Sequence, residues 1–345
     1  MILRHGIKLD QQKAASLRHK IQDLPAAENQ KPPERLPLRK GELNSNAIIA
    51  AAQAAGIVDE FDGVPLFQKL KKLRRLKPDM IVACCFDEDP CTTSAMATLR
   101  ENTNAIIAGL VLAGKACGAK ENKIAVATKR EAKLIQKINP QADLILAGER
   151  YPARALLKRK LFANRKNAAY IGAQACAALL AAIDDGEPQT FTVVTVAGDG
   201  VEHWRNVRAR IGTPLKDLLE FCGLSEKTSL VVTGSSITGE AVTDLNEPVS
   251  ATTRCVIALK KARNYKEYPC IGCQRCARAC PRGIVPWKVQ QELQNAKPDL
   301  VRLTNVQRCI RCAACTVACP SGIDLTGVVR KAAQLKKSGD FIDIT

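Results

Sequence analysis

The stretch CIGCQRCARACP, residues 270–281, is followed by a second stretch of the same pattern, CIRCAACTVACP, at residues 309–320. Each run places three cysteines at every third position, then a fourth cysteine four positions later, directly before a proline. Thiols at this spacing can surround one iron–sulfur cube, while the proline turns the chain so that the fourth thiol points away. The repeat therefore predicts a mainly helical domain at the end of the chain, organised by metal.

The spacing is that of bacterial two-cluster ferredoxins, in which the fourth cysteine of each run binds the cluster of the other run. It predicts two [4Fe-4S] clusters. We expect one cluster to be held by Cys270, Cys273, Cys276 and Cys319, and the second by Cys309, Cys312, Cys315 and Cys280. Two clusters held close together suit the transfer of single electrons rather than hydride chemistry.

Zinc and disulfides are the alternative uses of these cysteines. Zinc sites often include histidine, but His5, His19 and His203 all lie far from the runs. A disulfide framework belongs to an oxidising compartment, whereas residues 1–24 lack the apolar segment of a signal peptide. We expect a cytoplasmic protein without a transmembrane helix, with peripheral association at a membrane left open. The other cysteines are expected to be small buried side chains: Cys84, Cys85, Cys91, Cys117, Cys176, Cys222 and Cys255.

The chain is strongly basic. Its 345 residues include 52 Lys and Arg against 34 Asp and Glu, a net charge of +18. Residues 270–345 hold twelve basic and five acidic residues, which leaves +7 around the cysteine runs. Further basic patches lie at residues 69–77 and 150–166. Such charge steers acidic partners, so we expect an acidic electron carrier, such as a ferredoxin or flavodoxin, or other subunits of a redox complex. Aromatic residues make up only 4% of the chain, which argues against nucleic acid.

Hydrophobic patterning divides the chain into four regions. Residues 1–43 are polar and predict an irregular arm, whereas residues 44–188 alternate predicted strands and helices, which is typical of an α/β domain with a parallel sheet. Residues 189–262 combine short strands with one short helix, which is a β-grasp-like pattern. Residues 263–345 predict an α-helical domain with the cysteine runs. Within the second region, residues 94–118 predict one long amphipathic helix.

Two further stretches carry a family resemblance. DGEPQTFTVVTVAGDGVEHWRNVRARIGTPLKDLLEFCGL at residues 185–224 and VTGSSITG at residues 232–239, followed by the cysteine runs, resemble the RnfC component of the Rnf-type electron transport complex. The resemblance covers about residues 47 to 335 of this chain. Related families are the cobalamin reductases and the flavin subunit of complex I. It implies a Rossmann-like flavin domain at 44–188, a soluble-ligand-binding (SLBB-like) β-grasp domain at 189–262 and a two-cluster ferredoxin domain, without the family's N-terminal barrel-like domain.

The family's flavin and NAD motifs are degraded in this sequence. Its glycine-rich loop, G-x-G-G-A-G-F-P-T-G, corresponds to GIVDEFDGVPLFQKL at residues 56–70, where only Gly63 and Pro65 match. Acidic side chains at Asp59, Glu60 and Asp62 would repel a phosphate, and the glycines that let backbone amides approach one are lost.

The resemblance implies a degenerate flavin and NAD site at Gly63, Asp87, Asp89 and Tyr151. Two of these residues belong to an acidic loop that keeps the family's E-x-E-P character, whereas the turn after Tyr151 has lost both family glycines. We therefore expect FMN to be poorly held or lost.

Three functions remain open from sequence: an electron-transfer protein with two clusters, an FMN-containing NADH dehydrogenase or cobalamin reductase that feeds the clusters, and a protein in which the clusters are structural staples.

Overall fold

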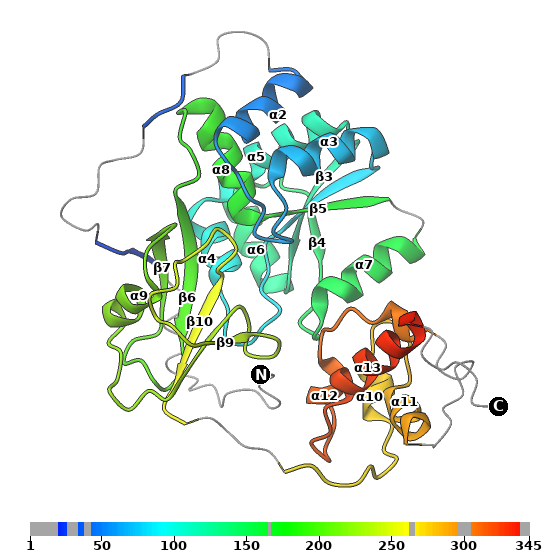
Figure 1. Ribbon diagram of the computed structural model, residues 1–345. Helices are drawn as coiled ribbons and strands as arrows, with labels where there is room; N and C mark the ends of the chain where they lie inside the picture. The colour runs from blue at the N-terminus through cyan, green and yellow to red at the C-terminus, as the bar shows by residue number, and fades with distance from the viewer. Residues whose placement is uncertain are drawn as a thin grey trace. The chain divides into compact units, whose positions relative to one another are not determined.

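The computed structural model describes residues 20–25, 34–37, 43–164, 167–261, 266–294 and 305–338. The chain forms two compact units (Figure 1). The larger unit comprises residues 8–235 and 241–261, and the smaller comprises residues 1–7, 236–240 and 262–345. Most of the predicted arm, and Arg165 and Lys166 of the second basic patch, lie outside the described residues.

A parallel four-stranded sheet forms the first half of the larger unit. Its strands are β2 (Met80–Cys84), β3 (Glu121–Val126), β4 (Leu144–Leu146) and β5 (Ala168–Gly172), in the order β4-β3-β2-β5. Every pair in it is parallel. Parallel strands need long crossover connections, which here are helices. The crossovers are α4 (Ser94–Glu101) with α5 (Thr103–Cys117), α6 (Lys129–Ile138) and α7 (Ala153–Ala163), while α2 (Ser45–Ala54) and α3 (Leu66–Leu76) precede β2 and α8 (Ala173–Asp184) follows β5.

Helices cover both faces of this sheet because alternate residues of each strand point to opposite sides. In β2, Ile81 and Ala83 pack into a core with α2, α3, α5 and α8, while Met80 and Val82 pack on the other face against α7. Helices α5 and α8 approach very closely, since a β-carbon on Gly109 would lie 1.9 Å from the carbonyl oxygen of Cys176. The seven cysteines outside the runs are all buried, as expected of small apolar side chains.

The single helix predicted for residues 94–118 is wrong: it is broken at Asn102 into α4 and α5. The hydroxyl of Thr98 donates to the carbonyl of Ser94, and that of Thr103 donates to the carbonyl of Leu99. Side chains that bond to the preceding turn in this way compete with the helix and bend it.

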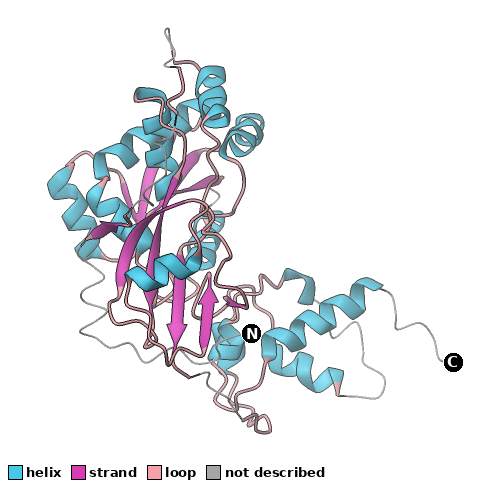
Figure 2. Ribbon diagram, turned by 60° about the vertical axis from the view of Figure 1, so that its left-hand side comes forward, coloured by secondary structure: helices cyan, strands magenta, loops and turns pink. Residues whose placement is uncertain are grey.

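A mixed six-stranded sheet follows. It has the order β1-β7-β6-β10-β8-β9 and contains β1 (Ile21–Asp23), β6 (Phe191–Ala197), β7 (Arg205–Arg210), β8 (Leu230–Thr233), β9 (Glu240–Val242) and β10 (Cys255–Leu259), with the short helix α9 (Leu215–Phe221) (Figure 2). Strand β10 pairs in parallel with β6 and antiparallel with β8.

Strand β1 corrects the prediction of an irregular arm. Three residues of that arm, Ile21–Asp23, pair in parallel with β7. The backbone N–H of Ile21 also donates to the carboxylate of Glu101 at 2.6 Å. The polar, proline-containing composition hid this strand because a three-residue edge strand shows no hydrophobic alternation.

Buried hydrogen bonds join the two sheets within the larger unit. The amide of Gln174 on α8 accepts from the backbone N–H of Val193 at 2.7 Å and donates to the carbonyl of the same residue at 3.1 Å. The N–H of Thr93 donates to the hydroxyl of Thr195 at 3.0 Å. The residues on the two sides of the predicted boundary at 188 therefore pack together.

The smaller unit is helical in its described residues after 266. It contains α10 (Arg275–Ala279), α11 (Pro286–Leu293), the 3-10 turn η1 (Val306–Arg308), α12 (Ala314–Val317) and α13 (Leu325–Ser338). Ile284, Val289, Val306 and Val329 form its small apolar core. The chain is thus a mixed α/β protein with two sheets and a C-terminal helical unit.

Candidate functional site

The fourth cysteine of each run lies with cysteines of the other run. Cys276 and Cys319 pack in one apolar cluster with Ile323 and Leu325. The second group lines a small cavity of about 20 Å³: Cys280, Cys309, Cys312 and Cys315, with apolar wall residues that include Ile284 and Val329. Among the described residues, no three His, Cys, Asp or Glu side chains form a group that could hold a single metal ion.

The electrostatics of the thiols follow the same grouping. Burial raises the pKa of Cys315 to about 11, and negative charge on Cys312, Cys280 and Cys309 would raise it further. Burial also raises the pKa of Cys276, and charge on Cys319 acts in the same direction. The thiolates of Cys276 and Cys315 are thus disfavoured until positive iron compensates them, which is the environment of a metal ligand.

The two runs have the same backbone conformation. Gly272 and Arg311, each two positions after the first cysteine of its run, have φ of +66° and +56°. Gln274 and Ala313, each following the second cysteine, have φ of +58° and +57°. Left-handed conformations at side-chain-bearing residues are uncommon and concentrate at binding sites. Alternating left- and right-handed residues turn successive N–H groups toward one centre.

This backbone fits an iron–sulfur cluster. The N–H of Arg311 already points at the sulfur of Cys309, at 3.4 Å. N–H groups directed at sulfur stabilise the negative charge of a cluster and tune its potential. The thiol donors and the N–H directions are therefore both compatible with the predicted metal.

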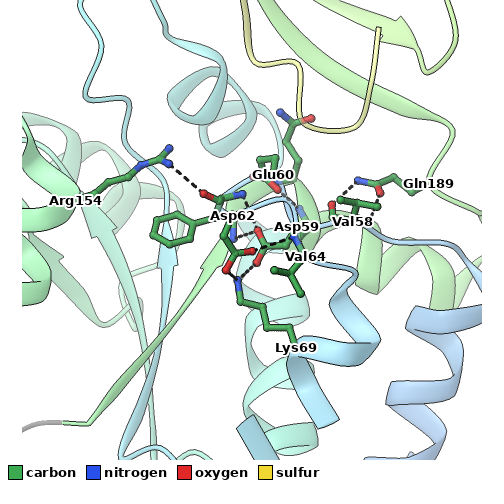
Figure 3. A network of polar contacts seen from close by, with 12 residues as sticks. Val58, Asp59, Glu60, Asp62, Val64, Lys69, Arg154 and Gln189 are labelled. Carbon is green, nitrogen blue, oxygen red and sulfur yellow. Dashed lines mark hydrogen bonds and ion pairs between the residues drawn. The ribbon is translucent and has the colours of Figure 1, made fainter. Parts of the chain in front are cut away.

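A second candidate site lies in the larger unit, where residues 57–66 form a tight turn before α3 (Figure 3). Asp59 accepts from the N–H of Gly172 at 2.9 Å and forms a buried ion pair with Lys69. Glu60 accepts from Gln174 N–H at 2.7 Å and from Ala175 N–H at 3.0 Å. Both carboxylates thus point into the start of α8.

Burial is the largest influence on the pKa values of Asp59 and Glu60. It raises the pKa of Glu60 to about 7, and the neighbouring charge of Asp59 acts in the same direction. Burial also raises the pKa of Asp59, against the charge of Lys69. Burial alone would lower the pKa of Lys69, but its two carboxylate partners outweigh burial and raise it. Lys69 therefore belongs to a buried pair and not to the exposed basic patch predicted from residues 69–77.

Acidic residues also fill the loop after β2. Asp87 accepts from the N–H groups of Ala95 and Met96, at 3.3 and 3.1 Å, at the start of α4. Asp89 accepts from Cys91 N–H at 2.8 Å and from the Ser235 hydroxyl at 2.7 Å. Burial raises the pKa of Asp87, opposed mainly by the charge of Arg254.

The other two residues of the predicted flavin site, Gly63 and Tyr151, lie in turns of the chain. Gly63 has φ of +74° and donates its N–H to the carbonyl of Asp59 at 2.8 Å, which closes the turn. Tyr151 precedes Pro152 through a cis peptide bond, just before α7. Gly63 and Asp87 thus lie in two different segments, the turn before α3 and the loop after β2, and each forms hydrogen bonds within the chain.

Sequence reasoning missed the role of Gly172 and the partners of Glu60. Gly172 ends β5 and directly precedes α8. A strand, a glycine and a helix in succession could have signalled an anion site, but β5 itself was not predicted. The acidic turn was expected to repel a phosphate, and the structure shows its carboxylates bonded to the helix start instead.

The comparison with protein families assigns residues 269–323 to the 4Fe-4S dicluster domain. This domain implies two [4Fe-4S] clusters. The chain is therefore an iron–sulfur protein of the electron-transfer class.

Relatives with curated names extend the match beyond the cysteines. The RnfC component of the ion-translocating oxidoreductase complex of Buchnera aphidicola is 33% identical over 134 residues, 38% of this chain and 26% of that protein. The corresponding component of the proton-translocating ferredoxin:NAD(+) oxidoreductase complex of Clostridium ljungdahlii is 25% identical over 71% of this chain and 58% of its own length. The Rhodobacter capsulatus counterpart is 26% identical over 74% and 53%. The chain resembles this RnfC-like family, and it spans little more than half of these relatives at most.

Solved structures show the same fold. A crystal structure of an NAD+-reducing [NiFe]-hydrogenase in the H2-reduced state superposes on 85% of this chain and 61% of its own, with a TM-score of 0.52 and 15% identity. Its air-oxidised state gives a TM-score of 0.53. At this identity the likeness concerns the fold alone. Among the described residues, no helix is both long and apolar enough to cross a membrane.

Proposed function

We propose that this protein relays single electrons between redox partners through two [4Fe-4S] clusters with crossed ligands. The observation that carries the proposal is the shared cavity of Cys280 with Cys309, Cys312 and Cys315, matched by the packing of Cys276 against Cys319. When bound, [4Fe-4S] clusters accept and release one electron at a time. The cysteines of both runs would hold them, and the N–H of Arg311 would support the sulfur of Cys309.

The family resemblance also supports a proposal for the fold of each domain. We propose a Rossmann-like domain at 44–188, an SLBB-like β-grasp domain at 189–262 and a dicluster ferredoxin domain at 263–345. The parallel order β4-β3-β2-β5 supports the first, and the mixed sheet with α9 supports the second. Both would serve as a docking scaffold.

The proposed partner is an acidic electron carrier or another subunit of a redox complex. Ile271 and Ile310, each directly after the first cysteine of a run, are 70% and 45% exposed. Arg275, Arg308 and Arg311 are exposed around them. Exposed apolar side chains with cationic neighbours in the sequence suit brief contacts with an anionic carrier, because charge raises the encounter rate without demanding tight binding. The proposed encounter takes place in the cytoplasm, where cysteines are kept reduced, at a membrane-bound complex or free of one.

Anaerobic purification tests the proposal, with iron, sulfide and flavin analysis followed by reduction with a flavodoxin or ferredoxin. We expect about eight irons per chain, and one-electron reduction that electron paramagnetic resonance detects as two interacting clusters. Bleaching by NADH with stoichiometric FMN would instead identify a flavin-dependent dehydrogenase. Clusters that no protein reductant reduces would identify structural staples.

A further inference from the structure

The order of the four-stranded sheet defines where a ligand would bind. The chain leaves β2 for β3 and β4 on one side and returns to add β5 on the other side. In open α/β sheets, ligands bind outside the carboxyl ends of the strands at such a reversal of order. Here the reversal lies between β2 and β5, where Cys84 pairs with Gly172 at the carboxyl end of each strand.

Phosphate groups at these positions are bound by the N–H groups that start the next helix. That helix is α8, of twelve residues. Three N–H groups at its start are already taken by the chain itself: Gly172 N–H by Asp59, and the N–H groups of Gln174 and Ala175 by the two oxygens of Glu60. Asp59 is fully buried and Glu60 is 6% exposed.

The carboxylate of Glu60 lies very close to the backbone of Gly172. A β-carbon on Gly172 would lie 2.2 Å from the carboxyl carbon of Glu60 and 2.3 Å from each of its oxygens. Gly172 has an ordinary φ of −77°, so the backbone conformation does not require glycine. The missing side chain leaves the room that Glu60 occupies.

At the starts of two neighbouring helices, α4 and α7, carboxylates also accept hydrogen bonds from backbone N–H groups. Asp87 accepts from N–H groups at the start of α4, and Glu88 accepts from Arg154 N–H at 2.9 Å at the start of α7. The partly buried guanidinium of Arg254 interacts with Asp87, Glu60 and Glu88. The carboxylates of the loops and the cations beside them thus form one network around the switch point.

We propose that Glu60 is a built-in anion that fills the phosphate position at the β2–β5 switch point, so that this site binds no flavin or nucleotide phosphate. FMN, which the family resemblance implies, does not fit the residues present. The inference does not rest on the proposed electron transfer, because it would hold equally if the clusters served only as structure.

A direct test compares FMN with riboflavin on the cluster-loaded wild-type chain, by equilibrium dialysis with flavin fluorescence. The two differ only in the phosphate, so a filled phosphate position predicts no tighter binding of FMN than of riboflavin. Stoichiometric FMN, or a clear preference for FMN, overturns the proposal. Neither result alters the iron content, so it leaves the proposed electron transfer to its own test.

A second test removes the built-in anion. Glu60→Ala leaves buried N–H groups without acceptors and should lower the Tm by roughly 5 °C. Acetate or inorganic phosphate, titrated at constant ionic strength, should restore the Tm of this variant saturably and leave the wild type unchanged. Glu88→Ala is the matched control, because Glu88 also accepts from a helix N-terminus but its side chain is 20% exposed. Absence of saturable rescue in Glu60→Ala, or equal rescue in both variants, overturns the proposal.

If Glu60→Ala fails to fold, Glu60→Gln keeps the shape and one acceptor oxygen. It should remain folded but show a lower Tm than the wild type, because the amide nitrogen cannot accept the N–H bond that the second oxygen of Glu60 accepts. An unchanged Tm would show that the second acceptor oxygen of Glu60 has no role there.

Discussion

Glu60 and Gly172 are in direct contact, since the carboxyl carbon of Glu60 stands 2.2 Å from the place that a β-carbon on Gly172 would take. The two residues lie far apart in sequence, one in the turn before α3 and the other at the end of β5. The contact joins a loop to the edge strand of the sheet.

The contact predicts strong coupling between two substitutions. Gly172→Ala should push the Glu60 carboxylate off the N–H groups of Gln174 and Ala175 and cost about 1–3 kcal/mol of unfolding free energy. Once Glu60→Ala has removed the carboxylate, the same methyl group should cost much less. We expect a coupling free energy of about 1 kcal/mol or more in a double-mutant cycle measured by guanidinium unfolding. Additive effects would show that the contact contributes nothing to stability.

The raised pKa of Glu60 predicts a pH dependence. A carboxyl with a pKa of 4.5 in the unfolded chain and about 7 in the folded chain binds its proton more tightly when folded. Its contribution to stability is therefore fully present below pH 4.5 and is lost as the pH rises toward 7. The groups facing Glu60 are Asp59, Cys85, Cys176 and Arg254.

The difference between wild type and Glu60→Gln isolates this contribution from that of Asp59 and Asp87. Between pH 5 and pH 7.5 the unfolding free energy of the wild type should fall more steeply than that of Glu60→Gln. Parallel curves would place the pKa of Glu60 near its ordinary value and require the network of Figure 3 to be fully charged.

Cys319→Ala should damage the cluster bound mainly by Cys270, Cys273 and Cys276. The packing of Cys319 against Cys276 is the physical reason. Mössbauer spectra of iron-57-enriched protein should show loss or conversion of one cluster, with the other unchanged. Cys280→Ala should give the complementary result. A change confined to the second-run cluster in Cys319→Ala would reject the crossed assignment.

Cys222→Ala is the matched control for these variants. Cys222 is fully buried but belongs to the larger unit. Its replacement removes one buried sulfur and should lower stability by about 1 kcal/mol while all iron is retained.

The repeated left-handed conformation predicts an asymmetry between the two runs. Arg311 has φ of +56°, where a side chain costs about 1 kcal/mol, whereas Gly272 occupies the equivalent position without that cost. Arg311→Gly should therefore retain both clusters and stabilise the smaller unit by up to about 1 kcal/mol, while Gly272→Ala should destabilise it. Anaerobic guanidinium unfolding monitored by cluster absorbance measures both. Equal destabilisation by the two changes would contradict the shared conformation.

Charge reversal should slow electron exchange with an acidic carrier. Arg275→Glu and Arg311→Glu change exposed side chains near the cysteines. Arg278 is left intact because it donates to the carbonyl of Cys273 at 3.1 Å. Stopped-flow rates with a flavodoxin should drop severalfold at low salt and converge with the wild type at high salt. Rates that are unchanged and independent of salt would remove electrostatic steering from the proposed function.

The sequence predicted the fold class because its strongest signals are local. Cysteine spacing and the alternation of apolar strands with helices depend on neighbouring residues, and strands β2 and β3 lie in the region 44–188 for which that alternation was predicted. Helix α3 was read only as basic charge, although Leu66, Leu70 and Leu73 recur at helical spacing. Strand β5 was missed because AAYIG offers little contrast between its two faces.

The second site could not be predicted in the same way, because its contacts are distant in sequence. No residue close to Glu60 in the sequence indicates that its carboxylate oxygens would accept from the N–H groups of Gln174 and Ala175. These two residues follow β5, which pairs with β2. The acidic turn therefore suggested only repulsion of a phosphate. The pairing of the fourth cysteines, which also spans the two runs, was predicted only because the repeated spacing carries it; the ligand assignment itself stays a prediction.

The carboxylate at the start of α8 changes how the stability of the larger unit depends on its surroundings. A nucleotide-binding domain gains stability from its ligand by mass action, in proportion to RT ln(1 + [L]/Kd), and loses it when the ligand is scarce. A tethered carboxylate has no such concentration term, since it is present wherever the chain is. The fold around β2 and β5 can then keep its shape whether or not flavin and nucleotides are abundant, and its stability responds to protons instead.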